Sequence, residues 1–371
     1  MSQPLDSTSK RADWLDVSKG IGILLVITVH SIIPQINAIT THLSSFTIPI
    51  FFILAGLTYN AKRHRYKLKE FAVSRGRQFL IPYFALYVII IVLFFLLPNV
   101  VDTYLTPDLM LYSLFYGSGP PTQSTHLWFL PVLYFGMLLF AGLDRLFAKA
   151  PRATRFSLLL VLPLTAVAIN SLFFPNLVPW HFGATLVSAT FVFIGNEMRE
   201  VNGVKFWATE SRIKDLLLIV SGVAVLLIVS ELNGFTDIAV DNIGVNVWLY
   251  LIAGTIGTSL VFVISSQIAI LTTSIRKSLV VLGNASQEIY EVHPFTFLLV
   301  PPLLLLFGWT TADIDAAYAL FWPLRFFLGV TISVIVVLFF IRKNQILSLL
   351  FTGSYKRMKQ KAPIPNIDEQ S

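Results

Sequence analysis

Apolar residues occur along this chain in blocks long enough to cross a lipid bilayer, separated by short polar segments. A membrane-spanning helix needs about 20 predominantly apolar residues, because each residue adds about 1.5 Å along the helix axis. Ten segments approach this length, the second, fifth and sixth being short: Val17–Ile33, Phe46–Tyr59, Phe79–Leu97, Leu127–Leu143, Phe156–Asn170, Phe182–Gly195, Leu216–Ser230, Val247–Thr272, Ile289–Phe307 and Ala317–Ile341. The pattern predicts an all-α integral membrane protein, a bundle of about ten transmembrane helices.

The distribution of Lys and Arg tests this count independently. If ten spans alternate in direction, the loops after the even-numbered spans share one side with both termini, and this side holds all but one of the 27 Lys and Arg residues. The opposite loops hold none; they are residues 34–45, 99–126, 171–181, 231–246 and 308–316. The positive-inside rule then predicts that both termini lie in the cytoplasm.

Composition agrees with this class. Of the 371 residues 55% are hydrophobic and 13% are charged, against about 25% charged residues in an ordinary soluble domain, and the mean hydropathy is +0.74. The net charge of +7 is explained by the topology and by anionic inner-leaflet lipids, so no nucleic-acid partner is expected. Cysteine is absent, which excludes disulfides, thiolate metal sites and a cysteine nucleophile.

The same pattern predicts the domain organisation. A polar cytoplasmic segment, residues 1–16, precedes one transmembrane domain, residues 17–341, and a basic polar cytoplasmic tail, residues 342–371, follows it. No spacing of His, Asp or Glu typical of a metal site occurs, so no metal is expected.

The first predicted span carries two polar residues on one helix face. Lys19 and His30 are eleven residues apart, which at 100° per residue leaves them about 20° from alignment and about 16 Å apart along the axis. An intramembrane histidine is a functional candidate, and neutral imidazole is the usual general base near neutral pH. The alternative is a structural histidine that bonds to a carbonyl of a neighbouring helix.

Two further basic features leave alternatives open. Arg325, the one cation inside a predicted span, either faces a wet cavity or a partner, or extends its head group to the outer surface. The loop Lys62–Arg77 holds seven Lys or Arg in sixteen residues. It is either an ordinary membrane-flanking anchor or a docking surface for a phosphorylated cytoplasmic ligand.

Five short motifs occur in a fixed order along the chain. Their residues are Arg11, Asp16, Lys19 and His30; Phe46, Pro49, Phe51, Phe52, Ala55 and Gly56; Arg75, Arg77, Pro82 and Tyr83; His126, Trp128, Phe129 and Pro131; and Ser286, Tyr290, His293 and Pro294. Together they resemble the acyltransferase-3 family of membrane O-acyltransferases, which includes the fucose 4-O-acetylase-like sugar O-acetyltransferases of bacteria. Glu291 departs from the family pattern, where an apolar residue is usual, and suggests a wetter position.

The resemblance implies transfer of an acyl group, usually acetyl, from acyl-CoA to a carbohydrate hydroxyl of a surface glycan or its precursor. Acyl-CoA is then the donor substrate, a carbohydrate or glycolipid is the acceptor, and no bound cofactor is expected. The implied location is the bacterial cytoplasmic membrane. We predict that His30 is the general base and that Lys19, Arg75, Arg77 and, more weakly, Arg11 contact the CoA phosphates.

Five other residues are predicted to line the acceptor site or the central cavity: His126, Trp128, Tyr290, His293 and Arg325. His126 and Trp128 are expected near the outer face, where Trp128 is also explained as an interfacial belt residue. Ser286, Tyr290 and His293 share one helix face, with His293 expected about one turn from the cytoplasmic end of its helix.

Two other functions compete with acyl transfer. A transporter or flippase for a glycolipid or polysaccharide would also need many spans and a buried cation such as Arg325, but no inverted repeat and few intramembrane acids are present. A non-catalytic scaffold or sensor would not account for Lys19 and His30 on one helix face.

Overall fold

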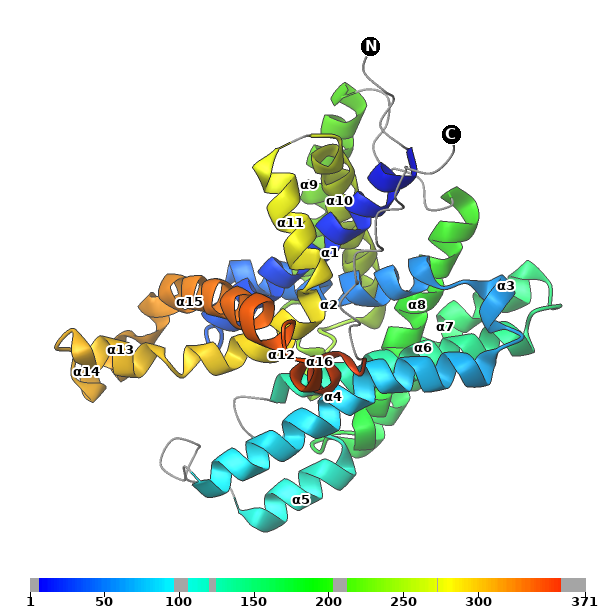
Figure 1. The fold of residues 1–371 in the computed structure, drawn as a ribbon. Helices are drawn as coiled ribbons and strands as arrows, with labels where there is room; N and C mark the ends of the chain where they lie inside the picture. The colour runs from blue at the N-terminus through cyan, green and yellow to red at the C-terminus, as the bar shows by residue number, and fades with distance from the viewer. Residues whose placement is uncertain (1–6, 97–105, 120–124, 203–211, 272, 355–371) are drawn as a thin grey trace, which may run out of the picture.

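The computed structural model describes residues 7–96, 106–119, 125–202, 212–271 and 273–354, and nearly all regular structure in them is helical (Figure 1). The α-helices are α1 (Ser7–Ile32), α2 (Ala38–Thr58), α3 (Ala61–His64), α4 (Leu68–Leu96), α5 (Pro107–Tyr116), α6 (Phe129–Leu146), α7 (Arg152–Phe173), α8 (Phe182–Asn202), α9 (Arg212–Asn233), α10 (Val247–Ile270), α11 (Ser274–Asn284), α12 (Ser286–Phe297), α13 (Val300–Leu306), α14 (Thr311–Ala317), α15 (Trp322–Ile335) and α16 (Gln345–Thr352). Shorter 3₁₀ turns are η1 (Thr125–Trp128), η2 (Pro179–His181), η3 (Ile238–Val240) and η4 (Tyr318–Phe321), and a π-helical segment, η5 (Val336–Ile341), continues α15. The all-helical class is therefore confirmed.

The described helices include eight that are long and apolar enough to cross a membrane, or nine if the bent pair α12–α13 is one broken span with a 41° bend. The predicted sixth span is α8, which is not among them. Most of α8 is buried in the protein, against α2, α6 and α7. A helix that faces other helices needs no continuous apolar surface for lipid. The protein is a multi-pass membrane protein, and the orientation of its termini remains a prediction.

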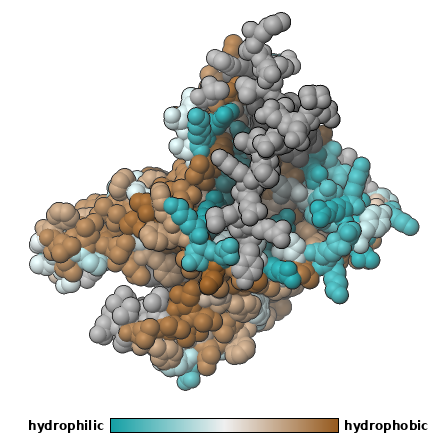
Figure 2. All heavy atoms as spheres, in the orientation of Figure 1, coloured by the Kyte–Doolittle hydropathy of each residue, from teal (hydrophilic) through white to brown (hydrophobic). Residues whose placement is uncertain are grey.

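Apolar side chains cover much of the exterior. In Figure 2 the surface over α13–α15 is brown, whereas hydrophilic side chains gather over α3 and the adjoining end of α6. Leu306, Phe307 and Phe327 are among the exposed large apolar residues of the brown region. This division is expected of a surface that meets lipid along its flanks and water at its ends.

Two glycines bring α11 directly onto α1. A Cβ atom on Gly20 would overlap the Leu279 carbonyl, and one on Gly283 would overlap the Asp16 carbonyl. Small residues permit such close approach between membrane helices, where packing rather than burial from water holds the helices together. The contact matters for function because α12, which carries His293, begins directly after α11.

A buried carboxylate ties the basic loop after α2 to the end of α6. The Asp144 side chain is fully buried and accepts two hydrogen bonds of 2.7 Å from Arg65, one from Nε and one from Nη2. The Tyr59 hydroxyl donates a third at 3.3 Å, and Arg155 Nη2 lies 3.6 Å away. Part of the basic charge of the loop is thus structural.

We expect Asp144→Ala to lower the free energy of unfolding by about 2–3 kcal/mol, because it leaves the partly buried Arg65 and Arg155 and the buried Tyr59 hydroxyl without this acceptor. Unfolding of the purified protein in detergent, followed by tryptophan fluorescence, measures the change. The control is Glu70→Ala, which removes the exposed 3.0 Å ion pair with Lys67 and should cost no more than about 1 kcal/mol. Equal losses in the two variants would contradict the structural role of Asp144.

Candidate active site

Three histidines from distant parts of the sequence meet inside the bundle: His30 on α1, His126 in η1 and His293 on α12. His30 Nδ1 lies 2.7 Å from His293 Nε2, and the two rings stack with centroids 5.0 Å apart and a 16° angle. The ring centroid of His126 lies 5.7 Å from that of His293. The structure therefore gives His30 a partner on another helix, which is a histidine ring rather than the carbonyl considered above.

The hydrogen bonds of the pair assign the protons on both rings. His293 Nδ1 lies 2.8 Å from the Tyr290 carbonyl oxygen, which can only accept, so Nδ1 carries a proton. In a neutral ring Nε2 of His293 is then an acceptor, and the proton between the two rings belongs to His30 Nδ1. His30 Nε2 is consequently unprotonated, and no described residue bonds to it. This is the state that a general base requires.

The prediction that His293 lies about one turn from the cytoplasmic end of its helix is wrong. That prediction started the span at Ile289, but α11 precedes α12 and packs on α1 near Lys19. His293 is fully buried and pairs with His30, which lies within the last turn of α1, whereas Lys19 lies eleven residues earlier. The histidine pair therefore lies at the C-terminal end of α1, about three turns beyond Lys19.

A cavity of about 1630 Å³ lies beside α1, with walls from α2, α4, α6, α12 and α16. Along α6 its lining runs from Phe129 to Arg145, which corresponds to about 24 Å of helix. Its basic lining residues are Lys19, Lys67, Lys69, Arg75, Arg77 and Arg145; its acidic ones are Glu70 and Glu288. The end near Phe129 and Val26 is mainly apolar. The cavity thus combines a cationic mouth with an apolar interior.

Three of the four predicted donor-binding residues, Lys19, Arg75 and Arg77, line this cavity. Lys19 Nζ pairs with Asp16 at 2.9 Å, and Arg75 Nη1 donates to Gln78 Oε1 at 2.6 Å. The side chain of Arg11 lies outside the described residues. The spacing of the motifs had not indicated that Lys67, Lys69 and Arg145 join the same lining.

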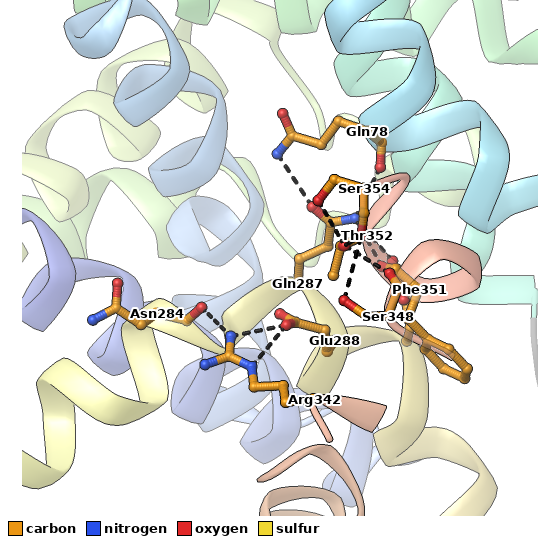
Figure 3. A network of polar contacts seen from close by, with 10 residues as sticks. Gln78, Asn284, Gln287, Glu288, Arg342, Ser348, Phe351, Thr352 and Ser354 are labelled. Carbon is orange, nitrogen blue, oxygen red and sulfur yellow. Dashed lines mark hydrogen bonds and ion pairs between the residues drawn. The ribbon is translucent and has the colours of Figure 1, made fainter. Parts of the chain in front are cut away.

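A polar network beside the cavity joins α4, α12 and α16 (Figure 3). Gln287 Nε2 donates to the carbonyls of Gln78 at 3.0 Å and Phe351 at 3.3 Å, while Gln78 Nε2 donates to Gln287 Oε1 at 3.2 Å. Arg342 Nε donates to Glu288 at 2.9 Å, and its Nη2 donates to the Asn284 carbonyl. The network fixes the junction of α11 and α12, and no sequence signal had indicated it.

The expectation that Glu291 lies in a wetter position is wrong. Its side chain is fully buried rather than wetter than the family pattern: Oε1 accepts from Gln287 at 3.1 Å, and Oε2 has no partner among the described residues. The physical reason is that Gln287, one turn earlier on α12, lines the cavity and bonds to Glu291, which does not line it.

Arg325 is fully buried, so the alternative in which it extends to the outer surface is wrong. Nε donates to the Ser31 carbonyl at 2.8 Å, Nη1 donates to the Tyr318 carbonyl at 2.5 Å, and the guanidinium lies 3.9 Å from the centre of the Tyr318 ring. Ser31 is in the last turn of α1 and Tyr318 directly follows α14, so both carbonyls lie at helix C-termini, where a cation is favourable. Arg325 therefore holds the last turn of α1, next to His30, against α15.

A family model described as "Acyltransferase domain" (Acyl_transf_3) matches residues 12–342, most of the chain. The chain belongs to the acyltransferase-3 family. A search of curated proteins and a search of solved structures gave no match. Membership implies acyl transfer between a donor and an acceptor, and the match contains His30 and all of the cavity lining except the part from α16 and the residues after it.

The two remaining predicted residues of the acyltransferase lie on either side of Phe129. Tyr290 lines the cavity, and its hydroxyl donates to the His126 carbonyl. Trp128 contacts Phe129 and His181, with ring centroids 6.1 and 5.6 Å away, and does not line the cavity. The acceptor roles of Trp128 and His126 remain predictions.

The described part of the acyltransferase contains no group of three or more His, Asp or Glu side chains arranged to hold a metal ion.

Proposed function

We propose that the protein transfers an acyl group from acyl-CoA to a carbohydrate hydroxyl of a surface glycan or its precursor, in the bacterial cytoplasmic membrane. The observation that carries this proposal is the hydrogen bond between His30 Nδ1 and His293 Nε2. A sugar hydroxyl is a weak nucleophile at neutral pH, and a positioned imidazole nitrogen is the usual means of activating it.

The proposed step uses the free nitrogen of His30. Nε2 removes the proton of the acceptor hydroxyl as its oxygen bonds to the thioester carbon. The tetrahedral intermediate then expels CoA as a thiolate, which takes the proton from Nε2. His293 accepts the hydrogen bond from Nδ1 throughout and orients the ring, and the Tyr290 carbonyl orients His293 in turn.

The cavity suits the proposed donor in charge and size. CoA carries several phosphates, and Arg and Lys side chains bind phosphate oxygens through charge-assisted hydrogen bonds. The volume of about 1630 Å³ exceeds the roughly 300–1,000 Å³ typical of sites for drug-sized ligands. Lys19, Arg75 and Arg77 would bind the phosphates, and the apolar interior would receive the pantetheine arm.

The decisive test follows labelled acetyl from acetyl-CoA into cell glycans, using membranes of host cells that lack or contain the protein. The proposal predicts incorporation that depends on the protein. Label that stays in acetyl-CoA would contradict acetyl transfer to glycans. If, in addition, the glycans were displaced across the membrane in a protein-dependent way, the transporter alternative would be favoured.

A double variant tests the donor side. We expect Arg75→Gln with Arg77→Gln to raise the KM for acetyl-CoA about 10–100-fold and to change kcat by less than about threefold. Hydrogen bonds to charged groups are worth about 1.5–3 kcal/mol, and about 1.4 kcal/mol is a factor of ten. Arg63→Gln is the control, because Arg63 is on the same basic loop but does not line the cavity. A KM equal to that of the wild type would exclude these arginines from donor binding.

A further inference from the structure

The inner end of the cavity is closed by two aromatic rings. Phe129 and Tyr290 both line the cavity, and their ring centroids are 5.2 Å apart at an interplanar angle of 61°. Neither His30 nor His293 lines it. The Tyr290 ring lies 6.0 Å from that of His293, which in turn stacks on His30. Tyr290, with Phe129 packed against it, therefore lies between the cavity and His293.

The two rings are held differently. The Tyr290 hydroxyl donates to the His126 carbonyl, so moving this ring breaks a buried hydrogen bond. In the part of the chain that the structure describes, Phe129 is held by ring contacts: it stacks on Phe52 at 5.5 Å and meets Phe51 and Trp128 edge-on at 6.0 and 6.1 Å. Of the two rings, Phe129 is therefore the one that an acyl group in the cavity can displace without breaking a hydrogen bond.

The surrounding packing limits this displacement. Phe129 is 6% exposed, and Phe52 behind it is fully buried. A close-packed core accommodates a small shift, but each added methylene has to find space among groups that are already in contact. The room for the acyl chain beyond the thioester carbonyl is therefore small.

We propose that Phe129 is the residue that limits the length of the acyl chain that the site accepts. This inference rests on the proposed function, because it assumes acyl-CoA in the cavity and His30 at the reacting hydroxyl. Phe129 stands at the first position of α6, lines the cavity and packs against Tyr290, whose ring contacts that of His293. Bulk at this position excludes longer chains, and a smaller residue admits them.

The test compares acetyl-, propionyl-, butyryl- and hexanoyl-CoA, each labelled in the acyl group, as donors to glycans in membranes that contain the wild type, Phe129→Leu or Phe129→Ala. Leu133→Ala is the matched control: Leu133 lines the same cavity one turn along α6 and is similarly buried, at 7% exposed. Protein amount in the membrane is equalised by immunoblot. The Leu variant keeps the experiment decisive if the Ala variant does not fold.

The wild type is expected to use hexanoyl-CoA at least about tenfold less well than acetyl-CoA, since a few methylenes in a closed pocket are worth factors of this size. Phe129→Leu should raise the hexanoyl-to-acetyl ratio about tenfold, and Phe129→Ala should raise it further, while Leu133→Ala keeps the wild-type ratio. Equal use of both donors by the wild type, or an unchanged ratio in the Phe129 variants, would overturn the inference and leave acyl transfer standing. Absence of transfer from every donor by inserted wild type would overturn the proposed function as well.

Discussion

Replacing His30 with Gln is expected to lower kcat for acyl transfer about 10²–10⁴-fold, the usual contribution of a positioned general base. Gln fills a similar volume and can accept a hydrogen bond, but its amide cannot take up a proton at neutral pH. The KM for acetyl-CoA should change little, because His30 does not line the cavity. Initial rates of label transfer in membranes with equal amounts of protein give both constants.

The control for this variant is His42→Gln. His42 is on α2 and bonds through Nδ1 to Ser230 Oγ at 2.8 Å, and it does not line the cavity. We expect its activity to stay within about threefold of the wild type. Full activity in His30→Gln would remove His30 as the base, and His126 or His293 would then be the residue to test.

The second large effect is expected at His293, whose role is to position His30. His293→Leu removes the acceptor for His30 Nδ1–H, so that the unprotonated nitrogen of His30 is no longer held toward the acceptor. Loss of the correct imidazole tautomer costs about 10⁴-fold in the best-studied catalytic triad, and we expect a fall in kcat of about 100-fold or more here. The KM for acetyl-CoA should be unchanged.

The conservative variant separates positioning from packing. The side-chain oxygen of His293→Gln can accept from His30 Nδ1–H, so this variant should retain about tenfold more activity than His293→Leu. A role in packing alone predicts the opposite order, because Leu is the better residue for an apolar core. Equal activity of the two variants, or an effect on KM alone, would contradict the positioning role.

The pattern of residues along the chain was enough to predict the class of the protein and to name candidate site residues. Hydrophobicity is a local property, so blocks of apolar residues predicted the helices. The charge of the connecting loops predicted on which side of the membrane each loop lies. The motifs named His30, Arg75, Arg77 and His293 because residue type and spacing are preserved in a linear string. Helical periodicity also placed Lys19 and His30 on one face of α1, and the structure places the cavity beside Lys19 and the histidine pair at His30.

The tertiary structure decided how these residues combine. Periodicity along one helix says nothing about which neighbouring helix it faces, so the pairing of His30 with His293 could not be derived from spacing. The same holds for Arg325, which has no acidic partner in its own segment and instead binds the carbonyls of Ser31 and Tyr318. Backbone carbonyls occur at every residue, and only packing decides which of them a side chain reaches.

The basic loop Lys62–Arg77 and α8 are two further cases in which the sequence predicted a segment but tertiary packing decided its role. Lys62–Arg77 is uniformly cationic in sequence, yet Arg65 pairs with the buried Asp144 while Arg75 and Arg77 line the cavity. The predicted sixth span was short because α8 is enclosed by other helices, where polar residues are tolerated. Hydropathy and charge thus determined which segments enter the membrane. Contacts between helices, which in a bilayer depend on shape and hydrogen bonding more than on apolarity, decided where the site lies.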